Sequence, residues 1–425
     1  MSADSQQKSG GSFRSFKHFN FRILFFANAM SNIGSWAQRV AQDWLVLQLT
    51  GSGRDLGIVT GLQFLPSLIF SLWAGAIADR FNKRKVLILT NVIGALSALI
   101  LGLLVITKTV ELFHVYILAF TLGLSGAIDA PVRQSFNSEL VAKEDLRNAV
   151  SLNSANFNAG RLVGPGLSGF MIAAFDTGPS FILNAISYLF VIGALFALKE
   201  EKLFKEVQQR SEVKIGAALN YVIARKDLLA VMITVFFVAT FGLNFQIYNA
   251  LMATKEFGKG PAEYGGLGTF VAVGSLSAAL LSAKLDRRRG PRFVLIFGTL
   301  FAASQIILCT LPTYSFYALT LPICGFLALT TMISANTFVQ TTTDPAIRGK
   351  VLGIYLMVFL GGSPFGSPVI GWISTLIGIR WTIAICAATI ITAILIVYLI
   401  LKNQLQRPAS ILLDDVLEGV TYNKD

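Results

Sequence analysis

The stretch that decides the fold is GAIADRFNKRKVL, residues Gly75 to Leu87. It closes a long apolar run with the pair Asp79 and Arg80, and three further cations follow at positions 83–85. Basic residues directly after an apolar helix are typical of a loop on the cytoplasmic side of a membrane. The stretch alone therefore indicates a membrane helix that ends in a cytoplasmic loop.

The composition indicates many membrane spans. Of the 425 residues, 54% are hydrophobic and 14% are charged, and the mean hydropathy is +0.65. A soluble core does not need so much apolar sequence with so few charges. Apolar runs of about 18 or more residues recur along the chain, which predicts helices rather than barrel strands. The expected class is an all-α membrane protein.

Twelve spans are predicted, in two sets of six. The first set covers 21–49, 54–78, 86–106, 112–139, 148–175 and 179–198, and the second covers 228–254, 262–285, 293–310, 313–341, 349–376 and 380–402. This divides the chain into a tail (1–20), a six-helix bundle (21–198), a linker (199–227), a second six-helix bundle (228–402) and a tail (403–425). The latter part of the linker is expected to form a helix at the inner membrane surface.

The distribution of Lys and Arg predicts the orientation. Of the 35 such residues, 27 fall on the side that holds both termini, five fall in the opposite loops and three fall within spans. This asymmetry predicts cytoplasmic termini and a multi-pass protein of the cell membrane. The net charge of +12 follows alternate loops rather than one soluble face, so no nucleic-acid partner is expected.

No cofactor or metal site is expected. Cys309, Cys324 and Cys386 lie inside apolar runs without paired spacing, which indicates neither a disulfide nor a metal. His18 and His114 lie outside the deep membrane region, and no nucleophile is paired with a base. A glycine-rich loop followed by Lys and Ser or Thr is absent from the sequence. The chain is therefore expected to be neither an enzyme nor directly driven by ATP.

Residues 75–87 resemble the signature loop of the major facilitator superfamily, between its second and third membrane helices. The match is carried by Gly75, Ala78, Asp79, Arg80, Lys83, Arg84 and Leu87. The family usually has glycine where this chain has Asn82. Asparagine tolerates a left-handed backbone better than most residues, so a tight turn is expected to survive there.

The resemblance implies twelve transmembrane helices in two pseudo-symmetric six-helix bundles. A weaker copy of the loop, Leu285-Asp286-Arg287, follows the eighth predicted span, as expected for related halves with a substrate site between them. Asp79 is expected to face the start of the eleventh span near Gly349, where the helix dipole favours a carboxylate. The implied gating residues are Gly75, Asp79, Arg80, Lys83 and Arg84.

A second motif is GRLVGPGLSG, residues 160–169. Gly160, Gly164 and Ser168 recur every four residues, which predicts a helix face that a neighbouring backbone can approach closely. Pro165 removes a backbone donor and bends the helix. The segment, which ends at Gly169, resembles the antiporter motif of major facilitator exporters, with Ser168 in place of a glycine. By resemblance it implies export.

The N-terminal half is further similar to the branch of enterobactin exporters and macrolide efflux proteins. The similarity is carried by Asp43-Trp44-Leu45-Val46 with Leu49 to Ser52, by Pro131 to Leu140, and by Leu152-Asn153 followed by Arg161. It is thinner in the C-terminal half. Because that branch transports chemically different molecules, the similarity does not choose a substrate.

Ionisable and polar residues inside the spans indicate the substrate cavity. Burying an ionisable group at the centre of a membrane helix costs about 2.5 to 3.5 kcal/mol. Such residues are therefore rarely retained unless they serve a function. A stripe on the first span is expected to line the cavity and comprises Asn28, Asn32, Ser35, Trp36, Arg39, Gln42 and Asp43. Arg39 and Asp43 are four residues apart and can neutralise each other, which leaves open a purely structural pair.

The predicted proton-coupling group is Asp129, with Arg133 and Arg161. Asp129 and Arg133 share a helix face, and Arg161 enters the membrane to a similar depth, so Asp129 is expected to meet both. A carboxylate shared between two cations could exchange a proton for substrate. The alternative is a permanently ionised, structural salt bridge.

The second half supplies uncharged groups to the predicted cavity. Asn244 and Tyr248 are expected to share a face of the seventh span, together with Gln246 and Asn249, and Asn336 is expected to contribute from the tenth span with Gln340.

The function that follows is export of small molecules, siderophore-like or drug-like, by alternating access in exchange for protons. The expected partners are a small-molecule substrate, protons and the lipid bilayer, and the protein is expected to be monomeric. An importer fits the first motif but not residues 160–169. A membrane scaffold or receptor on the same fold is a further alternative. The substrate charge stays open, because Arg39 and Arg161 suit an anion while Asp43 and Asp129 suit a cation.

Overall fold

The computed structural model describes residues 13–204, 215–284 and 290–402, without the side chains of residues 71–80, 215, 283 and 284. The first half contains α1 (Phe19–Thr50), α2 (Gly53–Arg80), α3 (Lys83–Ile106), α4 (Leu112–Glu139), α5 (Leu146–Phe175) and α6 (Gly178–Ala197). The second half begins with the short helix α7 (Ile215–Ala224) in the predicted linker.

The second half continues with a composite seventh segment, formed by α8 (Lys226–Phe237), the π-helical turn η4 (Val238–Gly242), α9 (Phe245–Leu251) and the π-helical turn η5 (Met252–Glu256). It ends with α10 (Pro261–Lys284), α11 (Pro291–Thr310), α12 (Tyr314–Thr342), α13 (Arg348–Gly361), α14 (Ser363–Ile377) and α15 (Ile379–Leu401).

Nine helical segments of the described chain are long and apolar enough to cross a membrane. The helices α1, α2 and α5, of 32, 28 and 30 residues, bring the number of membrane-length segments to twelve. The mean hydropathy of α1 and α5 is lower because of the polar positions they carry, such as the stripe on α1. The predicted all-α membrane fold is confirmed.

The seventh segment is broken, which the sequence analysis did not predict. The helix stops at Leu243 and Asn244, between η4 and α9. A break inside a membrane is tolerated where other groups satisfy the freed backbone atoms. Here the Asn244 side chain donates to the Thr240 carbonyl at 2.8 Å, and Gln305 donates to the Gly242 carbonyl at 2.7 Å.

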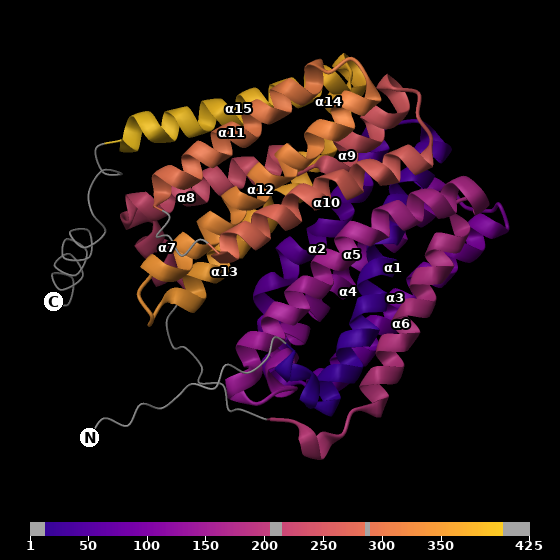
Figure 1. The fold of residues 1–425 in the computed structure, drawn as a ribbon, viewed down its shortest axis with the longest axis vertical. Coiled ribbons are helices and arrows are strands. Elements are labelled where there is room, and N and C mark those ends of the chain that lie inside the picture. The colour runs from indigo at the N-terminus through magenta and orange to yellow at the C-terminus, as the bar shows by residue number, and fades with distance from the viewer. Residues whose placement is uncertain (1–12, 205–214, 285–289, 403–425) are drawn as a thin grey trace.

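The two halves approach most closely near one end of the bundle. We call the end where α1 finishes the distal end, and the end where α1 begins the terminal end. At the distal end α2 lies against α14 and α5 against α10 (Figure 1). A Cβ atom on Gly57 would lie 2.4 Å from the Ser367 carbonyl oxygen, and one on Gly265 would lie 2.4 Å from that of Pro165. Only glycine permits such approach, so the backbones of the halves touch there.

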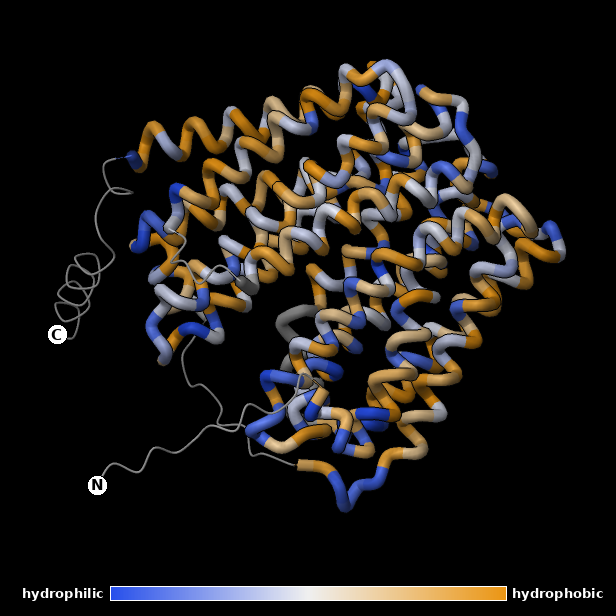
Figure 2. Tube along the Cα trace, viewed as in Figure 1, coloured by the Kyte–Doolittle hydropathy of each residue, from blue (hydrophilic) through white to orange (hydrophobic). Residues whose placement is uncertain are grey.

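The outer surface of the bundle is apolar. Figure 2 shows hydrophobic residues along the helices and hydrophilic residues gathered at their ends. Large apolar side chains are exposed on both halves, including Leu89, Leu103, Trp381 and Ile400. An exposed apolar belt of this kind is typical of helices that face lipid.

The loop before α3 differs from the expected left-handed turn. Asn82 has φ −63° and ψ 110°, and its side chain accepts a hydrogen bond from the Lys85 amide at 3.2 Å. Asn82 is thus the N-cap of α3, a position at which asparagine is among the best residues. The cap explains why asparagine can stand where the family usually has glycine.

The short helix η1 (Arg14–Lys17) holds a buried carboxylate at the terminal end. Asp145, which precedes α5, is 2% exposed and forms ion pairs with Arg14 at 3.1 Å and Lys17 at 2.8 Å. His18 Nε2 lies 2.7 Å from the same carboxylate. The hydrogen bond from Lys17, and after it the one from His18, keeps the pKa of the Asp145 carboxyl below its ordinary value.

Replacing Asp145 by asparagine is expected to lower thermal stability at pH 7, with a deficit that shrinks below about pH 4. A lowered folded-state pKa means that the stabilisation is present above the unfolded pKa of about 3.9 and is lost as the pH falls through the folded value. Lys17 is 63% exposed, so screening limits the effect to about 1 kcal/mol. Thermal unfolding of both proteins between pH 7 and pH 2.5 measures it. A deficit that stays constant over this range would contradict the assignment.

Candidate functional site

Two adjoining cavities lie inside the bundle. The N-terminal cavity, of about 470 Å³, lies within the first half, and its lining reaches Asn137 and Asn153 near the terminal end. The central cavity, of about 500 Å³, is lined by both halves. Arg39, Phe64 and Phe157 line both cavities, so they form the junction.

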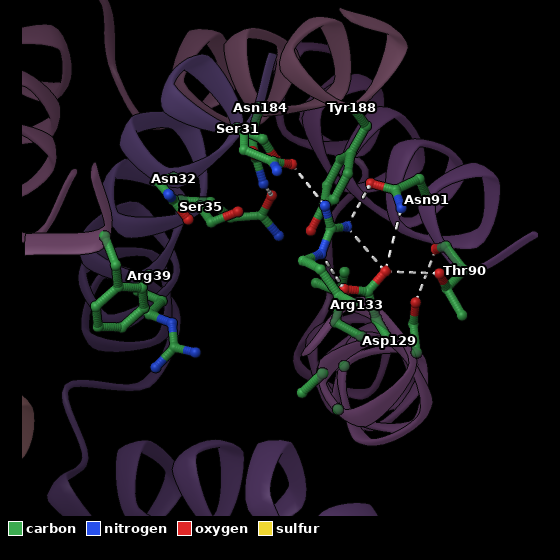
Figure 3. A pocket seen from close by; sticks show the side chains of 18 of the residues that line it. Ser31, Asn32, Ser35, Arg39, Thr90, Asn91, Asp129, Arg133, Asn184 and Tyr188 are labelled. Carbon is green, nitrogen blue, oxygen red and sulfur yellow. Dashed lines mark hydrogen bonds and ion pairs between the residues drawn. The ribbon is translucent and has the colours of Figure 1, made fainter. Parts of the chain in front are cut away.

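The N-terminal cavity holds a hydrogen-bonded ion pair (Figure 3). Asp129 accepts from Arg133 at 2.6 and 2.9 Å, from Thr90 at 2.8 Å and from Asn91 at 3.2 Å. Arg133 also donates to Asn28 on α1 at 2.5 Å. The predicted contact between Asp129 and Arg133 is therefore present, and it ties α4 to α1 and α3.

Arg39 lies at the junction, and Arg161 lines the central cavity. Each guanidinium is near the ring of Trp36, at 5.1 Å for Arg39 and 5.8 Å for Arg161. Neither forms a hydrogen bond or ion pair within the described part of the chain. The structure therefore does not bring Arg161 to Asp129, contrary to the expectation from their similar depths, because Arg161 faces the central cavity.

The predicted pairing of Arg39 with Asp43 is also not formed. Asp43 is 2% exposed and accepts hydrogen bonds from Tyr264 on α10 at 2.8 Å and from Gln246 on α9 at 3.3 Å. Spacing on one helix could not reveal these partners, because both come from the other half. Asp43 thus joins the two halves near the distal end through hydrogen bonds and acts on Arg39 only at a longer range than that of an ion pair.

Of the six remaining predicted cavity residues, four line one of the two cavities. Asn28 and Asn32 line the N-terminal cavity, while Trp36 and Asn244 line the central cavity. Two others line neither cavity. Tyr248 is 2% exposed and donates to the Phe241 carbonyl, and Asn336 accepts from Gln340.

The motif at residues 160–169 lies between three helices. A Cβ on Gly160 would lie 2.7 Å from Asn32 Cβ, and one on Gly164 would lie 2.5 Å from Trp36 Cβ, so α5 presses on α1 there. Farther along, a Cβ on Gly169 would lie 2.7 Å from the Pro261 carbonyl of α10. Pro165 also contacts α10. The motif therefore positions the cavity residues of α1 and seals the halves together.

Only part of the signature loop can be placed. Lys83 pairs with Glu139 at the end of α4 at 2.5 Å, and Arg84 pairs with Glu200 at 3.1 Å. The side chains of residues 71–80, which include Asp79 and Arg80, lie outside the described part of the structure. Contacts of Gly75 therefore cannot be described either. The expected approach of Asp79 to Gly349 therefore stays a prediction.

The sequence analysis missed several polar residues of the site. Thr90 and Asn91 bind Asp129, Tyr264 binds Asp43, and Tyr188 lines the N-terminal cavity. A usable signal was present for the first two, because consecutive polar residues interrupt the apolar run VLILTNVIGAL at 86–96. Tyrosines give no such signal in an aromatic-rich membrane protein.

Comparison with known proteins identifies the family. Residues 10–412 match the major facilitator family described as transmembrane secretion effector. The chain belongs to this family. It is therefore a multi-pass secondary transporter of the major facilitator type rather than an enzyme, as the motifs predicted.

The chain is similar to several transporters along most of its length. It is 24% identical to the staphyloferrin A transporter of Staphylococcus aureus, over 89% of this chain and 96% of that protein. It is 26% identical to the multidrug efflux pump Tap of Mycolicibacterium fortuitum, over 85% of this chain and 90% of that protein. It is 22% identical to the enterobactin exporter EntS of Shigella flexneri, over 83% of this chain and 85% of that protein.

Solved structures agree on the fold. A bacterial homologue of the human lysosomal transporter Spinster, in an inward-facing and unoccupied conformation, superposes with a TM-score of 0.73 at 15% identity. The match covers 92% of this chain and 97% of that one. It supports the fold alone.

Proposed function

We propose that the chain exports small amphipathic molecules across the cytoplasmic membrane by alternating access, in exchange for protons. The observation that carries this proposal is a cavity between two halves that are sealed at the distal end, where Gly57 meets Ser367 and Gly265 meets Pro165. The excess of Lys and Arg on the terminal side supports a cytoplasmic terminal end. The conformation is then one that loads substrate from inside the cell.

Asp43 contributes to the distal seal. Its hydrogen bonds with Tyr264 and Gln246 cross between the halves, so opening toward the outside must break them. The close backbone contacts at Gly57 and Gly265 also cross between the halves. Release to the outside would thus require both the polar link and the glycine contacts to separate.

Asp129 is the proposed proton site. It is a carboxylate in a polar cavity, held by Arg133 and by neutral donors on α3. Protonation would remove its charge and release Arg133, which also binds Asn28 on α1. One proton could thereby alter contacts among three helices. We further propose that the protein works as a monomer, because a single chain supplies both adjoining cavities.

The direction and substrate range follow from the relatives and from the motif at 160–169. Staphyloferrin A, enterobactin and drugs are named for the related transporters, and these are small molecules. A cavity lined by aromatic side chains and a few polar groups suits molecules with apolar and polar parts.

The export proposal is tested by comparing strains that lack or overproduce the protein. Untargeted mass spectrometry of medium and cell contents is expected to find a compound that leaves cells only when the protein is intact. Accumulation of a compound inside overproducing cells would favour an importer instead. The absence of any difference would favour a scaffold that has lost transport.

A further inference from the structure

We infer that the transported substrate is an anion, with its acidic group held between Arg39 and Arg161 and its apolar body in the central cavity. This inference rests on the proposed transport function and names the chemical class of its substrate. A carboxylate or a phosphate fits two guanidinium groups, because each guanidinium can donate two parallel hydrogen bonds to either group.

The two arginines are the cavity cations that form no hydrogen bond or ion pair within the described part of the chain. Arg39 lies 5.1 Å from the Trp36 ring and 6.0 Å from that of Phe64, and Arg161 lies 5.8 Å from Trp36. Because both guanidinium groups lie near the same indole ring, the distance between their central carbons cannot exceed the sum of their two distances to the Trp36 ring. Figure 3 shows Arg39 apart from the bonded network around Asp129. An unpaired cation inside a membrane protein is costly, and a bound anion would remove that cost.

The carboxylates that could have bound a cation are already occupied. Asp129 accepts two hydrogen bonds from Arg133 as well as those from Thr90 and Asn91. Asp43 is 2% exposed and accepts from Tyr264. The charge of Asp129 is therefore compensated by Arg133, and Asp43 is held in hydrogen bonds between the halves and lines neither cavity.

The charge of the site favours an anion as well. The linings of the two cavities contain Arg39, Arg133 and Arg161 but only one acid, Asp129. Counting the nearby Asp43 still leaves one positive charge in excess. A cavity with excess positive charge and low-dielectric walls attracts anions and repels cations.

The position of the two arginines gives the shape of the ligand. Arg39 lies at the junction, with amides and hydroxyls of the N-terminal cavity on one side. On the other side, the second half presents apolar side chains to the central cavity, namely Phe245, Val271, Leu329, Met332 and Phe359. A ligand with an acidic head at the junction and an aryl or alkyl body would contact both halves at once.

The test measures binding of three probes to the purified full-length protein in detergent by calorimetry. The probes are 2-naphthoate, its neutral amide and the cation 2-naphthylmethylammonium, which share one aryl body. Naphthoate is expected to bind about tenfold or more tightly than the amide, since a charged hydrogen-bonded contact is worth at least that factor. Arg161→Gln and Arg39→Gln are each expected to remove this preference and to leave amide binding unchanged.

The matched control is Arg22→Gln, which removes an exposed arginine near the terminal end and should leave naphthoate binding unchanged. Arg161→Lys keeps the charge and should retain part of the preference, which guards against a folding defect in the glutamine variant. Equal binding of the three probes, tighter binding of the cation, or no binding of naphthoate up to its solubility limit would overturn the inference.

The binding test and the export test can fail separately. Binding is measured without a gradient, so it does not depend on direction or proton coupling. An exported compound together with no anion preference would overturn this inference alone. Anion preference together with no exported compound would uphold the site and contradict the proposed export.

Discussion

Replacing Asp129 by asparagine is expected to abolish transport driven by a pH gradient. The rate should fall to that measured without a gradient, because asparagine keeps the shape of the side chain but can neither carry charge nor take up a proton. Arg133 would lose the partner it holds at 2.6 and 2.9 Å. The measurement is transport into proteoliposomes with and without a pH gradient, using a substrate found by the export comparison.

The matched control for this prediction is Thr90→Val. It removes the 2.8 Å hydrogen bond to the same carboxylate and leaves the titrating group in place. Coupling should survive in this variant, with a changed pH dependence. If Asp129→Asn still transported in response to a pH gradient, Asp129 would be a structural ion-pair partner and coupling would reside elsewhere.

Replacing Gly57 by leucine is expected to prevent closure at the distal end and to stop the transport cycle. Even the Cβ atom would lie 2.4 Å from the Ser367 carbonyl oxygen, a backbone atom that cannot move aside without shifting α14. Overpacking of this kind costs about 1 to 3 kcal/mol, so the population should shift by about 5-fold to 150-fold toward the state with the distal end open. Transport should fall correspondingly.

The shift can be measured by electron-spin distances between labels at Lys108→Cys and Lys255→Cys, exposed positions on the two halves. The native cysteines are buried and should label little. Gly193→Leu is the control, because a Cβ there meets nothing within 4 Å. A distance distribution in Gly57→Leu equal to that of the unsubstituted protein would contradict the expected role of this contact.

The sequence predicted the fold well because its signals are local. A membrane span shows as a run of apolar residues, and the loop at 75–87 and the motif at 160–169 are contiguous in the chain. The polar stripe on α1 was likewise predictable, since helical periodicity places Asn28, Asn32 and Arg39 on related faces. These residues do line the cavities.

The sequence by itself determined the membrane class, the family and the positions that carry charge inside the bilayer. Only the tertiary structure decided which charges neutralise each other. Arg39 and Asp43 have a favourable spacing, yet Asp43 binds Tyr264, which is 221 residues away. Likewise Asn244 and Tyr248 are one helical turn apart, yet only Asn244 lines the central cavity, while Tyr248 donates to the Phe241 carbonyl. Partner choice depends on which helices meet across the bundle, and spacing along one helix carries no information about that contact.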